Sequence, residues 1–205
     1  MRAFEKRYVD REEIDTGPLS ARKLDRAWLL LSLALLALLL LNAYLSYGFI
    51  PLHIAFLMPL AFVFARIAAV DLCYLLILNI YTIPLFFTGL IYHISFGGLS
   101  LQESLLGALV AGLIGIGLSL FMALLDKQKG EFGLGDVKML LVMGAWVGLG
   151  ALAFAFAIAF IMNLIIAFMV PRKQAIPFGF GLVFGTWVMV AFKEQFMNAL
   201  FYFFA

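Results

Sequence analysis

Cysteine and charge are both scarce in this 205-residue sequence. Its one cysteine is Cys73, which excludes an internal disulfide and a zinc site built from two CxxC pairs. Charged residues make up 13% of the chain and the formal net charge is +2, too small to indicate nucleic-acid binding. The sequence also lacks ten-residue stretches of alternating polar and apolar residues, which excludes a transmembrane β-barrel.

Apolar residues dominate instead. They make up 65% of the chain, and the mean hydropathy is +1.09. A soluble domain of this size cannot bury so much apolar surface, so lipid is the solvent for most of the chain. An apolar run of about 20 residues is long enough to cross the hydrocarbon core as a helix. We therefore predict an all-α, polytopic membrane helix bundle with seven transmembrane segments, at residues 27–48, 51–70, 74–95, 104–125, 137–149, 150–170 and 179–203.

The predicted bundle is preceded by a charged segment. Residues 1–26 are polar and Gly17-Pro18 interrupts any helix there, so we expect a solvated cytoplasmic tail. A membrane-surface helix or a partner-binding segment is the alternative. Residues 27–48 then form an additional N-terminal transmembrane helix, which we expect to stay uncleaved because the apolar run contains no small-residue cleavage site. Residues 49–205 form the main membrane domain.

The fourth predicted segment carries many small residues. Small side chains let membrane helices approach closely, so this face predicts tight helix packing without any functional claim. The residues are Gly107, Ala108, Ala111, Gly112, Gly115 and Gly117.

The basic residues orient the predicted helices. Loops on the cytoplasmic side of a membrane carry an excess of lysine and arginine. Seven alternating spans with a cytoplasmic N-terminus place twelve of the fourteen basic residues on one side. These are the seven in the N-terminal tail together with Lys127, Lys129, Lys138, Arg172 and Lys173.

Two acids lie at the cytoplasmic ends of predicted spans. Asp71 closes the second segment, and Asp136 opens the fifth behind Gly133 and Gly135. The glycines free the backbone to adopt positive φ and let another chain approach closely. Ionisable residues at a membrane are functional candidates, although Asp136 could equally be a helix cap. A nucleotide-binding loop is disfavoured, because no strand precedes the glycines and no Walker lysine follows them.

Paired carboxylates offer a known catalytic device. Two acids close together share a proton, because both cannot ionise cheaply. The ionised partner takes a proton from water while the protonated partner polarises a peptide carbonyl. Such a pair at a membrane surface would hydrolyse a peptide bond beside a membrane helix and requires no metal or organic cofactor.

Three stretches of the sequence resemble the type IV prepilin peptidases, a family of GxGD-type membrane aspartyl proteases. The stretch from Asp71 to His93, DLCYLLILNIYTIPLFFTGLIYH, is similar to the family's first active-site region. GLGDVK, from Gly133 to Lys138, is similar to its second, and Ile176-Pro177-Phe178-Gly179 resembles a third element near its last helix. Together they cover residues 60–190, so residues 49–205 are expected to be a prepilin-peptidase-like domain.

The resemblance implies specific roles for these residues. Asp71 and Asp136 would be the catalytic dyad, with Gly133 and Gly135 as the motif's backbone. Lys138 would hold the loop or adjust local electrostatics, unless it is only a positive-inside anchor, and Asn79 would be a supporting residue. The substrate would be a membrane-inserted, pilin-like precursor with a basic leader.

The sequence also departs from the family pattern. Leu78 replaces the family's proline before Asn79, and Leu75 and Leu76 stand where basic residues are usual. Many bacterial members carry a cysteine-rich cytoplasmic domain and also methylate the new N-terminus. This chain has one cysteine and resembles the compact form, so a methyltransferase activity is not supported.

Two other classes of function stay open. A transporter module would use the acids as proton or cation sites, although they lie at helix ends and the sequence shows no repeated halves. A catalytically inactive membrane partner with the same fold is the other alternative, given Leu75, Leu76 and Leu78. Serine and metal proteases are disfavoured because the sequence has no nucleophile–histidine arrangement and no HExxH motif.

Overall fold

The computed structural model describes residues 24–45, 51–125, 133–170 and 176–204, and every secondary-structure element within them is a helix. All seven predicted segments correspond to helices, which confirms the all-α membrane bundle. Residues 1–23 of the N-terminal tail and the loops with Lys127, Lys129, Arg172 and Lys173 lie outside the described residues, whereas residues 24–26 form the start of the first helix. The helices are α2 (Leu24–Leu45), α3 (Pro51–Tyr74), α4 (Asn79–Phe96), α5 (Leu101–Leu125), α6 (Leu134–Val147), α7 (Leu149–Met169) and α8 (Phe178–Phe204).

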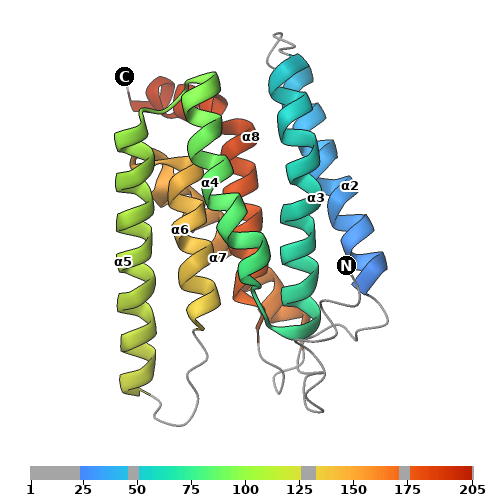
Figure 1. Cartoon of the computed structure of the whole chain (residues 1–205), viewed down its shortest axis with the longest axis vertical. Coiled ribbons are helices and arrows are strands. Elements are labelled where there is room, and N and C mark those ends of the chain that lie inside the picture. The colour runs from blue at the N-terminus through green and yellow to red at the C-terminus, as the bar shows by residue number, and fades with distance from the viewer. Residues whose placement is uncertain (1–23, 46–50, 126–132, 171–175, 205) are drawn as a thin grey trace.

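The helices run up and down in an antiparallel bundle (Figure 1). The C-terminal end of α3 and the N-terminal ends of α4, α6 and α8 all lie at the lower end in that view. Within the described residues, four helices, α2, α3, α5 and α7, are long and apolar enough to cross a membrane. Large apolar side chains such as Leu113, Phe160 and Phe168 are exposed on the outside of the bundle, as expected where lipid is the solvent. The chain is therefore a multi-pass membrane protein.

Three aromatic residues form the centre of the bundle. The rings of Phe64 on α3, Trp146 on α6 and Trp187 on α8 are buried and pack against one another through Phe64. Each indole N–H donates to a backbone carbonyl, that of Leu85 for Trp146 and that of Leu35 for Trp187. Because a buried indole needs an acceptor, these bonds fix α6 against α4 and α8 against α2.

The small-residue face of α5 packs against α6 as the sequence predicts. A Cβ atom on Gly107 would overlap the backbone at Gly144 and Gly148, and one on Gly144 would overlap the backbone at Gly107. Gly112 and Gly115 likewise face Leu141 and Leu140. Gly117 is the exception, because a Cβ atom there would meet open space. Gly117 is two residues from Gly115 and therefore lies on the other side of α5, off the contact face.

The boundary between the second and third predicted segments is wrong. Helix α3 continues through Asp71 to Tyr74, and α4 begins only at Asn79. The break comes from Leu75, whose φ of 52° is left-handed and cannot continue the helix. Hydropathy misses this break because Leu75–Leu78 is as apolar as the helix before it. Asp71 thus lies inside the last turn of α3, where its carbonyl accepts the Leu75 amide at 2.9 Å.

Candidate active site

Asp71 is buried against the start of α8. Asp71 is 3% exposed, and its carboxylate Oδ2 accepts a hydrogen bond from the backbone N–H of Phe180 at 2.9 Å. The backbone N–H of Gly179 also donates to this carboxylate. The first amides of a helix have no partner within their own helix, and a carboxylate there is stabilised by the positive end of the helix dipole. Asp71, from α3, therefore acts as an N-terminal cap for α8.

Asp136 lies in the first turn of α6, which begins at Leu134. Its Oδ2 accepts a hydrogen bond from the backbone N–H of Gly133 at 3.1 Å, so Asp136 does cap its own helix. Asp136 lies outside the four candidate membrane spans. Burial raises the pKa of its carboxyl to about 6, and the hydrogen bond from Gly133 opposes part of that rise.

The structure brings the two acids together. Asp71 and Asp136 are separated in sequence by the whole of α4 and α5, yet their carboxylates are close enough to interact electrostatically. Each is also held by backbone amides at the N-terminus of a helix, α8 for Asp71 and α6 for Asp136. Two interacting carboxylates held by separate helices, Asp71 buried and Asp136 partly buried, form an arrangement suited to general acid–base chemistry.

Of the two motif glycines, Gly135 serves close approach, and neither adopts unusual backbone angles. Gly133 has a φ of −80°, and neither Gly133 nor Gly135 has positive φ, so that part of the sequence expectation is wrong. A Cβ atom on Gly135 would lie 3.0 Å from Cβ of Ile77. The glycine therefore lets the loop after α3 lie directly against the first turn of α6.

Ile77 was not anticipated from the sequence. Besides contacting Gly135, it faces Gly179, where an added Cβ atom would lie 2.5 Å from Ile77 Cδ1 and 3.0 Å from Asp71 Oδ2. The side chain thus fills the space between the first turns of α6 and α8, beside the Asp71 carboxylate. The third motif, Ile176–Gly179, was the available signal for this end of α8, but it does not indicate which side chain packs there.

Lys138 and Asn79 meet at the edge of the site. The Lys138 ammonium on α6 donates a hydrogen bond to Asn79 Oδ1, at the start of α4, at 2.7 Å. The contact joins two residues 59 positions apart and links the helix of Asp136 to the end of the 75–78 loop.

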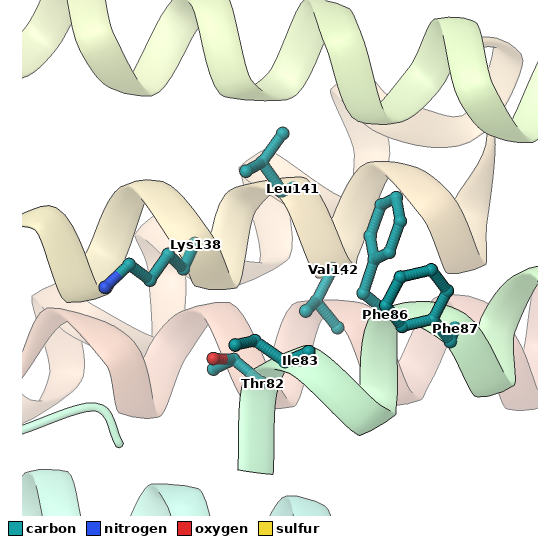
Figure 2. A pocket seen from close by; sticks show the side chains of 7 residues that line it. All are labelled: Thr82, Ile83, Phe86, Phe87, Lys138, Leu141 and Val142. Carbon is teal, nitrogen blue, oxygen red and sulfur yellow. The ribbon is translucent and has the colours of Figure 1, made fainter. Parts of the chain in front are cut away.

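A small apolar pocket lies between α4 and α6 next to Lys138 (Figure 2). Its volume is about 220 Å³, enough for one or two apolar side chains. The lining residues are Thr82, Ile83, Phe86, Phe87, Lys138, Leu141 and Val142. In the described ranges, no group of three or more histidine, cysteine or acidic residues lies close enough together to hold a metal ion.

Comparison with known proteins identifies the family. Residues 58–168, just over half of the chain, match the model of the type IV leader peptidase family, and the chain belongs to this family. The matched range contains Asp71, Asn79, Asp136 and Lys138.

The curated relatives carry the name prepilin leader peptidase/N-methyltransferase. The protein from Dickeya chrysanthemi is 30% identical over 63% of this chain and 45% of its own length. The protein from Neisseria gonorrhoeae is 30% identical over 58% of this chain and 42% of its own length. The protein from Klebsiella pneumoniae is 33% identical over 60% of this chain and 53% of its own length. The chain thus spans about half the length of the curated relatives it matches. No solved structure gives a significant match.

Proposed function

We propose that this chain is a membrane-embedded aspartic endopeptidase that removes the basic leader from type IV pilin-like precursors. The carrying observation is the pairing of Asp71 with Asp136, two carboxylates at the same end of the bundle that interact while amides of different helices hold them. Family membership supports the leader-peptide substrate. The N-methyltransferase half of the relatives' name is not carried over to this chain.

The proposed mechanism uses one proton shared by the dyad. One carboxylate, in its ionised form, takes a proton from water as the water attacks the scissile carbonyl. The other, in its protonated form, donates a hydrogen bond to the carbonyl oxygen as negative charge develops there. The proton then passes to the leaving amine, and the dyad returns to its starting state. Amides at the helix N-termini stabilise the negative charge of the dyad throughout.

The position of the dyad suits a leader at the cytoplasmic face. The acids lie at the end of the bundle where α6 and α8 begin and where Lys138 also lies. With a cytoplasmic N-terminus in the inner membrane, this end faces the cytoplasm, where a basic leader is held by the same charge asymmetry. The leader would reach the acids from water while the rest of the precursor stays in lipid.

The pocket between α4 and α6 suits the apolar part of the precursor. It opens beside Lys138, which is two residues from Asp136, and its lining is almost wholly apolar. A precursor whose leader joins an apolar helix at the cleavage point would place an apolar side chain there. The hydrogen bond from Lys138 to Asn79 would hold α4 and α6 at the spacing that forms this pocket.

The proposal is tested by cleavage of a defined precursor. The purified full chain in proteoliposomes is mixed with a precursor bearing a basic leader and an apolar helix, and the products are identified by mass spectrometry. Release of the intact leader is the expected result. Failure to cleave pilin, Tad-type and pseudopilin precursors alike would favour the inactive partner, and proton flux across the same vesicles without cleavage would favour the transporter.

A further inference from the structure

Asn163 binds the first turn of α8 at two points. It lies on α7 and is 6% exposed. Its Nδ2 donates a hydrogen bond to the carbonyl of Phe178 at 3.2 Å, and its Oδ1 accepts one from the N–H of Gly181 at 3.1 Å. Both the nitrogen and the oxygen of the Asn163 amide are therefore hydrogen-bonded to α8, at two residues that are three positions apart.

The same turn supplies the donors to Asp71. The amides of Gly179 and Phe180, which donate to the Asp71 carboxylate, lie between the two residues that Asn163 binds. Asp71 from α3 and Asn163 from α7 thus satisfy consecutive amides at the start of α8, which have no partner within their own helix. Any rotation of this turn that broke the bonds to Asn163 would also redirect the amides that face Asp71.

The helices approach very closely at this point. A Cβ atom on Gly181 would overlap Asn163 Oδ1 and the carbonyl of Ala159. The turn therefore has no side chain of its own at the contact with α7, and the two hydrogen bonds from Asn163 fix its rotation there.

We propose that Asn163 is a positioning residue for the catalytic carboxylate Asp71, acting through the first turn of α8. This inference rests on the proposed function, because it assigns the reaction to Asp71. Asn163 holds the turn so that the amides of Gly179 and Phe180 keep the Asp71 carboxylate in one orientation. The pocket between α4 and α6 is lined by neither α7 nor α8, so substrate binding is separate from this effect.

The first test separates kcat from KM in the cleavage reaction. Asn163→Leu keeps the approximate volume and removes both hydrogen bonds. Asn42→Leu is the matched control, because Asn42 accepts a hydrogen bond from Gln195 near the other end of α8. We expect Asn163→Leu to lower kcat about tenfold with KM within about twofold, and Asn42→Leu to change neither. Equal kcat in the two variants would overturn the inference.

The second test does not require activity. Thermal unfolding is measured for Asp71→Asn, Asn163→Leu and the double variant in the same detergent. If the two residues act on one turn, the Tm shift of the double variant falls short of the sum of the single shifts by about 3 °C or more. The same cycle with Asn42→Leu should be additive. Additive shifts for Asn163 would overturn the positioning role, whereas a coupled cycle in a chain that cleaves no precursor would refute only the proposed peptidase.

Discussion

The backbone N–H of Phe180 donates a 2.9 Å hydrogen bond to the side chain of Asp71, 109 residues earlier in the chain. This bond ties the last turn of α3 to the first turn of α8. The donor to this buried carboxylate is a backbone N–H, which any residue other than proline at position 180 would supply. Asp136 is bound in the same manner by the amide of Gly133, so in the described part of the chain both acids accept hydrogen bonds from amides at helix N-termini.

Gly179 should not tolerate even one methyl group. In Gly179→Ala the new Cβ would press on Ile77 Cδ1 and on the Asp71 carboxylate. We expect precursor cleavage to fall at least about tenfold, because a small displacement of a catalytic group is costly. Ile77→Val removes the Cδ1 contact and leaves the one with Asp71. Full recovery of cleavage in the double variant would show that the carboxylate was not displaced.

Hydropathy predicts the seven helices well because solvation by lipid is a bulk property of each segment. It cannot place the end of α3, since Leu75–Leu78 is as apolar as the helix and the break depends on one left-handed residue. The acids were found because charge is rare in such a chain. Their amide partners were not, because a backbone N–H has no sequence signature and Phe180 reaches Asp71 only through the packing of α3, α7 and α8. The role of Ile77 could not be predicted either, because its contacts with Gly135 and Gly179 also form only when distant segments pack together.

Stability should depend on pH through Asp136. Its pKa in the folded chain is raised by burial to about 6 from an ordinary value of 3.8, so the folded state binds the proton more tightly than the unfolded state. Stability therefore falls as pH rises from about 4 through 6, on the order of 1 kcal/mol because the residue is partly exposed. Thermal unfolding at pH 5 and pH 7.5 measures this. Asp136→Asn should flatten the pH dependence, and an unchanged slope in that variant would contradict the assignment.

The effects of substitutions at Lys138 and Asn79 on kcat should be coupled, because the two side chains share a hydrogen bond. If Lys138 acts through Asn79, then Lys138→Met and Asn79→Leu each lower kcat by about fivefold, and the double variant is no worse than either. Steady-state cleavage rates of the four proteins measure the cycle. If Lys138 is only a positive-inside anchor, the Asn79→Leu variant, which keeps the positive charge, should have normal activity.

Filling the pocket should weaken precursor binding. Ile83 lines the pocket from α4 and is 53% exposed, so Ile83→Trp can occupy the space without disturbing the core. We expect KM to rise several-fold, with kcat within about twofold. Ile91→Trp is the control, because Ile91 is equally exposed on α4 and does not line the pocket. Similar kinetics for the two variants would exclude the pocket as a substrate site.

The packing of α5 on α6 should be intolerant of added volume. In Gly144→Ala the Cβ would overlap the backbone of Gly107, and we expect a loss of about 1–3 kcal/mol in the free energy of unfolding. Gly117→Ala, whose Cβ meets open space, should cost nothing. Thermal unfolding of both in one detergent measures the difference, and a Gly144→Ala protein as stable as wild type would contradict the close approach.

The central claim is that Asp71 and Asp136 form one catalytic dyad, and leader cleavage by isosteric variants tests it most directly. Asp71→Asn and Asp136→Asn keep a hydrogen-bond acceptor for the helix amides and remove the titrating acid. Glu103→Gln is the matched control, because Glu103 accepts the Ser100 amide at the start of α5, at the opposite end of the bundle. We predict folded proteins throughout, normal cleavage by Glu103→Gln, and a loss of about a thousandfold or more in each aspartate variant. Cleavage that survives in either Asp71→Asn or Asp136→Asn would contradict the dyad.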